Sequence, residues 1–265
     1  MSHIIAIANQ KGGTGKTTTT LNLGAALTQG GETVLLVDMD SQANCSSGLG
    51  VVLAGRDLSI KDVLLRDEEA EGITRETPID GLYLMPSRLS LADIEMQLTT
   101  EIGGFRRLAV ALSKEKDRYG HIIIDCPPSL GILCINGIVA SDEIIIPMEG
   151  ETYAMEGMEA FEGMLENISV AYGHKPFVLG ILITKFRKGT TLHEGMLSTL
   201  RQKRPGGVFE TVIRQNIEVA SANVEKMPVV ALRPDCRGAQ DYIALADEVL
   251  NREKSRTSRD GEEIS

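Results

Sequence analysis

The chain has 265 residues, of which 42% are hydrophobic and only 4% aromatic, with no tryptophan. This length and composition allow a large aliphatic core and fit one α/β domain better than two small ones. The formal charge is −10, from 27 Lys and Arg against 37 Asp and Glu. Such a balance excludes a surface that is basic throughout but leaves room for a local basic patch.

The cysteines and the apolar runs bear on the compartment. The four cysteines form no Cys-x-x-Cys pair and no zinc-type spacing, which is typical of a reducing environment. No apolar run approaches the roughly 18 residues that a membrane span needs, and the N-terminus lacks a signal-peptide pattern. We therefore expect a cytoplasmic protein that does not bind membranes.

Apolar, β-branched runs alternate with helical patterns along the chain. The predicted strands are 4–8, 33–38, 82–85, 122–125, 143–147, 177–184 and 209–213. The predicted helices are 17–29, 90–98, 105–118, 131–140, 155–172, 191–203 and 240–252. This alternation predicts a single α/β domain over residues 1–251, with a mostly parallel, twisted sheet covered by helices on both faces. Residues 252–265 are polar and lack apolar periodicity, so we expect a disordered tail.

A glycine-rich loop separates the first predicted strand from the first helix. Residues 9–18 read Asn-Gln-Lys-Gly-Gly-Thr-Gly-Lys-Thr-Thr. Backbone amides in such a loop, together with the positive end of the helix, predict a phosphate cradle. Lys16 would reach the terminal phosphates, and the Thr17 hydroxyl would ligate Mg²⁺. The usual Gly-x4-Gly-Lys-Ser/Thr pattern lacks its first glycine here, because Gln10 takes that place and Lys11 follows.

The pattern Lys-Gly-Gly-x-Gly-Lys-Thr resembles the deviant Walker A box of the ParA/MinD class, and the ParA/Soj-type partition ATPases in particular. The resemblance implies a P-loop NTPase that uses ATP and Mg²⁺ and is a homodimer when ATP is bound. Lys11 would reach across the dimer interface to the partner's nucleotide. The nucleotide-binding residues are then Lys11, Gly12, Gly13, Thr14, Gly15, Lys16, Thr17 and Thr18.

Three aspartates follow predicted strands, where ligands of parallel sheets bind. Asp38-Met-Asp40-Ser-Gln-Ala-Asn resembles the switch I stretch of ParA proteins, with Ser41 in place of a proline. The resemblance implies that Asp40 positions or activates the attacking water and that Asp38 supports the metal shell. The aliphatic strand that closes on Asp125 has the pattern of a Walker B element, whose aspartate holds Mg²⁺.

Three later segments resemble the same family. The stretch from Asp125 resembles switch II, in which Gly131 would offer its amide to the γ-phosphate. Residues 147–157 resemble a segment near the dimer face, so Glu151 would touch nucleotide or partner, with plain helix capping as the alternative. Asn216 ends a stretch similar to one that borders adenine, which locates the adenine pocket approximately.

A basic stretch is the candidate nucleic-acid surface. Residues 185–204 carry six basic side chains against the single acid Glu194, a local charge of +5. A solvated helix face is the alternative, and the resemblance favours DNA because ParA dimers bind nonspecific DNA through basic residues in their C-terminal part. The candidate DNA-binding residues are Lys185, Arg187, Lys188, Arg201, Lys203, Arg204 and Arg214, and Arg233 and Arg237 could extend the patch.

Together these motifs predict an ATP-dependent DNA partition protein, associated with the nucleoid, in which Lys11, Lys16 and Asp40 serve catalysis. A ParB-like centromere-binding protein or another adaptor would stimulate hydrolysis and reset the dimer. One alternative is a ParA-like ATPase that positions a non-DNA cargo. A MinD-like membrane ATPase would need a basic amphipathic C-terminal helix, which residues 252–265 do not offer. A redox ATPase like the nitrogenase iron protein would need cluster cysteines, and Cys126 and Cys134 are wrongly spaced for it.

Overall fold

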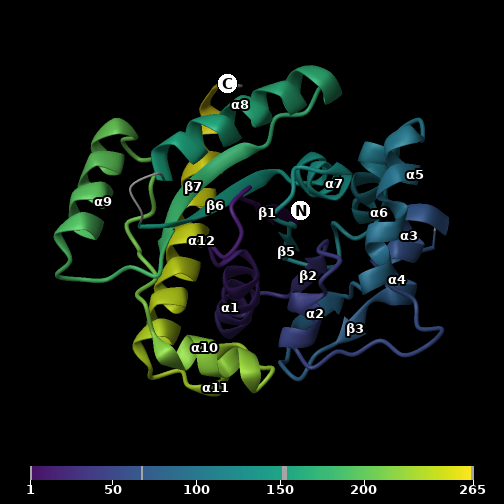
Figure 1. The fold of residues 1–265 in the computed structure, drawn as a ribbon, viewed down its shortest axis with the longest axis horizontal. Coiled ribbons are helices and arrows are strands. Elements are labelled where there is room, and N and C mark those ends of the chain that lie inside the picture. Colours follow the sequence, from purple (N-terminus) through teal and green to yellow (C-terminus); the bar gives the residue numbers. More distant parts are fainter. Residues whose placement is uncertain (1, 67, 151–153, 264–265) are drawn as a thin grey trace.

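A seven-stranded sheet forms the centre of the protein in the computed structural model, which describes residues 2–66, 68–150 and 154–263 (Figure 1). Its order is β3-β4-β2-β5-β1-β6-β7, and only the pairing of β3 with β4 is antiparallel. The mostly parallel α/β sheet predicted from the sequence is therefore confirmed. The strands are β1 (His3–Ile7), β2 (Val34–Asp38), β3 (Arg75–Glu76), β4 (Leu82–Met85), β5 (His121–Asp125), β6 (Glu143–Glu149) and β7 (Phe177–Thr184).

Helices cover both faces of the sheet, as expected from strands that are apolar on both sides. In β1, Ile4 and Ala6 belong to one buried cluster, and Ile5 and Ile7 to the other. The second cluster lies under α1 (Lys16–Gln29), α2 (Asn44–Gly48), α10 (Ile217–Val224), α11 (Val229–Leu232) and α12 (Arg237–Glu263). The first lies under α3 (Ile60–Arg66), α4 (Ala70–Ile73), α5 (Glu95–Thr100), α6 (Arg107–Ser113), α7 (Ile132–Ala140), α8 (Ala154–Tyr172) and α9 (Thr191–Lys203).

The predicted strand 209–213 is wrong. This segment runs beside β7, and the Ile213 amide donates to the Ile183 carbonyl at 2.8 Å. Before Ile213, however, the amides of Glu210 and Thr211 donate to the carboxylate of Glu248 on α12, at 2.8 and 2.9 Å. Because those two amides are used by a side chain, no continuous strand ladder forms along the segment.

The predicted bounds agree closely with the observed ones for three helices and differ more for others. Helix 191–203 is confirmed at both ends, and α1 and α8 each begin one residue earlier than predicted. Helix 90–98 divides into a 3₁₀ turn, Leu89–Ile94, and α5, while helix 105–118 begins with a 3₁₀ turn, Gly104–Arg106, and ends at Ser113. Strand β3 and helices α2, α3, α4, α10 and α11 were not predicted, since each is at most eight residues long.

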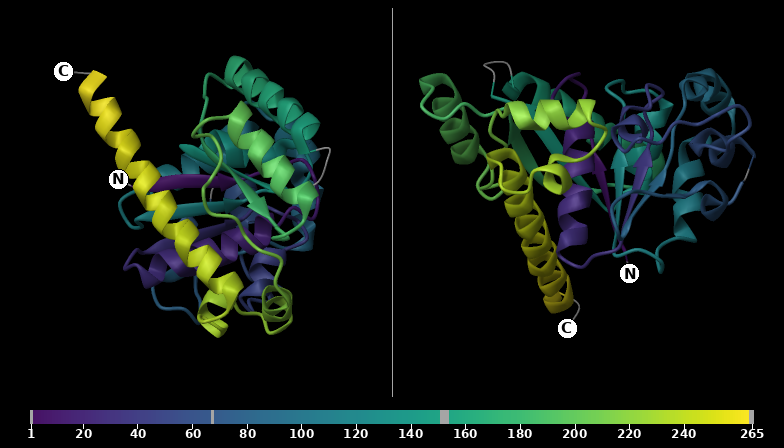
Figure 2. Two further views of the ribbon diagram at one scale, coloured as in Figure 1. Left: turned by 90° about the vertical axis from the view of Figure 1, so that its left-hand side faces the viewer. Right: turned by 90° about the horizontal axis from the view of Figure 1, so that it is seen from below.

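The C-terminal helix corrects the expected tail. We predicted disorder from residue 252, whereas α12 continues as a helix to Glu263, with its last turns extending away from the sheet (Figure 2). The Arg252 guanidinium lies 4.2 Å from the centre of the Phe209 ring and donates to the Val208 carbonyl at 2.6 Å. These contacts anchor a segment whose own sequence is too polar to show a core-facing period. In the described part of the chain, no helix combines the length and the apolar character needed to cross a bilayer.

We predict that a chain ending at residue 251 is less stable than the full chain by about 2 kcal/mol or more, because charged hydrogen bonds of Arg252 are lost. Urea unfolding followed by circular dichroism measures the difference. A chain ending at residue 257 keeps Arg252, Glu253 and Arg256 and serves as the matched control. Equal unfolding free energies for the two truncated chains would contradict the structural role assigned to this part of α12.

Candidate nucleotide-binding site

The glycine-rich loop connects the end of β1 to the start of α1 in a conformation that needs glycine at two positions. Gly13 and Gly15 have φ values of 78° and 90°, in the left-handed region that other residues rarely adopt. Gly15 directly precedes the helix, and its carbonyl accepts from the Thr19 amide at 2.8 Å. The loop therefore presents backbone amides at a helix N-terminus, which is the geometry expected for a phosphate cradle.

Residues at the ends of β6 and β7 fix this loop from the side. The Thr184 hydroxyl lies 2.8 Å from the Thr14 carbonyl oxygen. The Lys185 ammonium donates to the Gly13 carbonyl at 2.8 Å and forms an ion pair with Glu149. Thr184 and Glu149 were not predicted from the sequence, and Lys185 was predicted to belong to the DNA surface. Their position at the carboxyl ends of neighbouring parallel strands is the signal that could have found them.

The two lysines of the loop lie in different environments. Lys11 is exposed, whereas Lys16 is buried, and the Lys16 Nζ donates to the Lys11 carbonyl at 3.1 Å. Burial lowers the pKa of Lys16, and the nearby Asp125 carboxylate opposes that shift. A phosphate bound in the loop would favour the charged form of Lys16 in the same way.

Asp38 and Asp125 meet at the carboxyl edge of the sheet because β2 and β5 pair in register, with these two residues as partners. The Thr17 hydroxyl donates to Asp125 Oδ2 at 2.7 Å. Burial raises the pKa of Asp38 to about 6, and burial followed by the charge of Asp38 raises the pKa of Asp125 well above its ordinary value. Two buried carboxylates beside a hydroxyl are an oxygen donor set that fits Mg²⁺.

Asp40 lies in the loop that Asp38 organises. Asp38 Oδ1 accepts from the Asp40 amide at 3.1 Å, while Oδ2 accepts from the amide and the hydroxyl of Ser46 at 2.8 and 2.7 Å. Asp40 Oδ1 in turn accepts from the Gln42 amide at 2.9 Å. Asp40 is 9% exposed and Asp38 is fully buried, so Asp40 is the better placed of the two to contact solvent or substrate.

Two further predicted residues stand at helix starts. Gly131 directly precedes α7. Asn216 directly precedes α10, and its side-chain oxygen caps that helix by accepting from the Glu218 amide at 2.8 Å. Gln215 joins this segment to the end of β7, through an amide that donates to the Phe186 carbonyl at 2.9 Å.

The remaining predicted residues are placed as follows. Thr18 lies in the first turn of α1, and Gly12 lies exposed in the loop. Glu151 lies outside the described residues.

The predicted DNA-binding arginines are mostly engaged with acids. Arg204 forms an ion pair with Glu162. The guanidinium of Arg214 donates to both carboxylate oxygens of Asp241, and its Nε lies 3.0 Å from each. Arg201 pairs with Glu210 at 2.8 Å.

The exposed members of the patch are Lys185, Arg187, Lys188 and Lys203, of which Lys185 is engaged with the glycine-rich loop and Glu149. Arg187 donates from Nε to the Gln215 side chain. Lys203 lies in the last turn of α9, and Lys188 lies in the segment between β7 and α9. Arg233, a possible extension of the patch, pairs instead with Glu218 and Glu225. The accessible positive charge is therefore concentrated between the end of β7 and the end of α9.

We predict that Mg²⁺-dependent nucleotide binding weakens as pH falls through about 6, the raised pKa of Asp38, because protons then compete with the cation. Well below that value, the affinity of the wild type should fall by about tenfold per pH unit. Isothermal titration of Mg²⁺ into the ADP complex at several pH values measures this affinity. Asp38→Asn is the matched control, because it keeps the pH dependence of the nucleotide itself. Identical pH profiles for both chains would contradict the prediction.

Comparisons with known proteins agree with this geometry. A family model described as an AAA domain matches residues 2–175. The chain is 39% identical to the sporulation initiation inhibitor protein Soj of Bacillus subtilis over 94% of this chain and 98% of that protein. It is 34% identical to the chromosome partitioning protein ParA of Caulobacter vibrioides over 97% of each.

Among solved structures, cobyrinic acid a,c-diamide synthase from Mycobacterium smegmatis with bound ADP and magnesium superposes with a TM-score of 0.84. It is 32% identical over 96% of both chains. The similarity thus extends over nearly the whole chain in sequence and in fold. With its glycine-rich loop, its paired aspartates and these relatives, the chain belongs to the ParA/MinD family of P-loop ATPases, as a ParA/Soj-type member.

Proposed function

We propose that this ATPase is a DNA partition protein, which closes into a dimer on ATP, binds DNA nonspecifically on the nucleoid and resets by hydrolysis. The observation that carries the proposal is the similarity to Soj and ParA over almost the full length of both relatives. A ParB-like centromere-binding protein, or another adaptor, would stimulate the hydrolysis step. The synthase activity named for the structural neighbour belongs to that protein and is not part of the proposal.

The proposed reaction transfers the γ-phosphoryl group of ATP to water and gives ADP and phosphate. The loop amides and Lys16 would hold the phosphates and stabilise the charge that develops on them. Thr17 and Asp125 would hold Mg²⁺, which neutralises phosphate charge when bound, and Asp38 would support that metal shell. Asp40 would orient the attacking water. Because the site is preorganised by burial and hydrogen bonds, positioning and electrostatics supply most of the proposed catalysis.

The separate environments of the two loop lysines support the dimer in this proposal. Lys16 is enclosed by its own loop, whereas Lys11 is exposed at the start of the loop, beside the exposed residues Gly12 and Gly13. A lysine at this exposed place can reach a nucleotide in a second copy of the chain without leaving its own fold. This is the role that the deviant loop suggests for Lys11.

The exposed cations near α9 support the DNA part of the proposal. Nonspecific DNA binding needs accessible positive charge that contacts phosphates, and it does not need a shaped pocket. Arg187, Lys188 and Lys203 provide such charge in a chain whose net charge is −10. Arg201, Arg204 and Arg214, which are engaged with acids, would contribute less.

Lys11→Ala and Asp40→Ala should separate the two steps of the proposed cycle. The Lys11 variant should bind ATP but stay monomeric, since it lacks the group that reaches the partner. The Asp40 variant should dimerise but hydrolyse ATP about 100-fold or more slowly, because the water is no longer oriented. Light scattering after gel filtration and phosphate release measure the two properties. An ATP-dependent dimer of the Lys11 variant would contradict its cross-subunit role.

Lys188→Ala combined with Lys203→Ala should weaken ATP-dependent DNA binding and reduce the slope of log affinity against log salt by about two. Fluorescence anisotropy with a random-sequence duplex at several salt concentrations measures both. The charge-matched control is Lys114→Ala with Lys175→Ala, because those lysines are exposed and paired with Glu69 and Glu166. Equal losses in both double variants would place the DNA surface elsewhere.

A further inference from the structure

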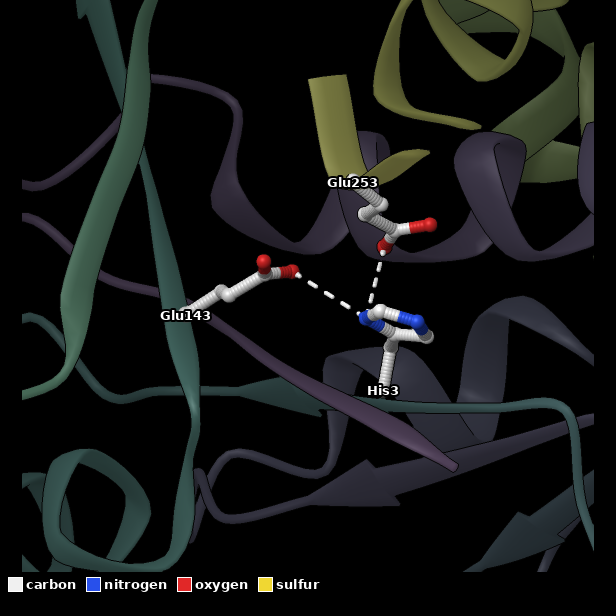
Figure 3. A group of neighbouring side chains, drawn as sticks. All are labelled: His3, Glu143 and Glu253. Atoms are coloured by element: carbon white, nitrogen blue, oxygen red, sulfur yellow. Dashed lines mark ion pairs between the residues drawn. The ribbon is translucent and has the colours of Figure 1, made fainter. Parts of the chain in front are cut away.

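A second group of ionisable side chains lies at the edge of the sheet opposite the nucleotide loop. His3, His121 and Glu143 are the first residues of β1, β5 and β6, and His3 and His121 are register partners with stacked rings. Glu253 approaches them from α12 (Figure 3). The strand length separates this group from the loop end of β1 by about 13 Å. The proposed ATPase cycle uses none of these four residues.

Three donor atoms converge in this group. His3 Nδ1 lies 3.8 Å from Glu143 Oε2 and 3.7 Å from Glu253 Oε1, as the dashed lines in Figure 3 show. Donors around a tetrahedral metal ion with bonds of about 2.1 Å lie about 3.4 Å apart. The two distances from His3 exceed that value by a few tenths of an ångström, and all three donor atoms lie within 4.8 Å of one another, so a modest contraction would bring them around one ion.

Each carboxylate has one oxygen engaged and one directed at His3. Glu143 Oε1 accepts from Arg256 at 2.7 Å, and Glu253 Oε2 lies 3.1 Å from His121 Nε2. Glu143 Oε2 and Glu253 Oε1 are buried and have no hydrogen-bond partner among the residues that the structure describes. Glu143 is fully buried and Glu253 is 4% exposed, so holding these two oxygens beyond hydrogen-bond distance of their ion-pair partner His3 is costly. A cation between them would remove that cost.

We propose that His3, Glu143 and Glu253 bind one divalent transition-metal ion of the Zn²⁺ type. One imidazole and two carboxylates suit this class, whereas Mg²⁺ prefers an all-oxygen set. His121 is the positioning residue, because it orients Glu253, and its other ring nitrogen lies 3.4 Å from Glu32. The His3 side chain is 37% exposed and gives the ion a way in. The ion would tie α12 to the starts of β1 and β6.

Equilibrium dialysis of the metal-stripped full chain against Zn²⁺, with excess Mg²⁺ to fill the nucleotide site, tests the proposal. The wild type should bind one equivalent, and its thermal unfolding midpoint should rise. His3→Gln should lower the affinity at least about tenfold and abolish the thermal shift. His193→Gln, which removes a histidine on α9, is the matched control and should bind like the wild type.

A measurement on the unmodified chain makes the result independent of how the variants fold. The chain has four histidines, so their imidazole NMR signals can be followed individually on adding Zn²⁺. The signals of His3 and His121 should change, and those of His174 and His193 should not. Absence of bound Zn²⁺ in the wild type, an unchanged affinity in His3→Gln, or changes at His174 or His193 alone would each overturn the proposal.

Discussion

The burial of Asp38 and Asp125 at adjoining strand ends, beside the buried Lys16 at the start of α1, is the constraint on which the nucleotide edge of this protein depends. Solvent is removed from one cation and two carboxylates, so burial lowers the pKa of the lysine and raises the pKa of both acids. The strand register brings the two acids together whether or not a ligand is present. A bound polyanion would face the charge of Lys16, and a bound divalent cation would face the charges of Asp38 and Asp125. The fold therefore holds a site whose electrostatic balance requires both ligands.

The buried charges explain why neighbouring residues form several hydrogen bonds to Asp38 and to the glycine-rich loop. Asp38 cannot move without breaking its bonds to Ser46 and to the Asp40 amide. Thr184 holds the Thr14 carbonyl from the other side. These bonds hold the loop and the switch segment in place from both sides, and such preorganisation reduces the reorganisation that catalysis would otherwise require. Position 41 is a serine, so no proline ring fixes the backbone there, and the hydrogen bonds of Asp38 hold the segment on either side of it.

The sequence predicted the glycine-rich loop and the strand ends beside it because their signals are local. The loop glycines, the strands that end in Asp38 and Asp125, and the parallel sheet all follow from short patterns that carry their own geometry. Contacts between distant segments gave no such signal. Glu248 diverts the amides of a predicted strand, and Lys185 turns away from the basic stretch toward the loop. Both depend on groups more than thirty residues away, the Glu248 carboxylate and the Gly13 carbonyl, and composition cannot place those.

The same lack of a local signal for contacts between distant segments explains why the helical end of α12 was not predicted. The last turns of α12 lack an apolar period, because their partners are mainly backbone carbonyls and buried acids, whereas the earlier part of the helix packs on the apolar core. Arg252 donates to carbonyls beside β7, and Arg256 meets Glu143 at the start of β6. Carbonyls at sheet edges are hydrogen-bond acceptors that need partners, and arginines on a passing helix supply donors in fixed positions. α12 therefore closes the edge at which the strands begin, while the loop occupies the edge at which they end. Each edge of the sheet holds buried charge, and at each edge groups from outside the strands contact it, Thr17 at Asp125 and Arg256 at Glu143.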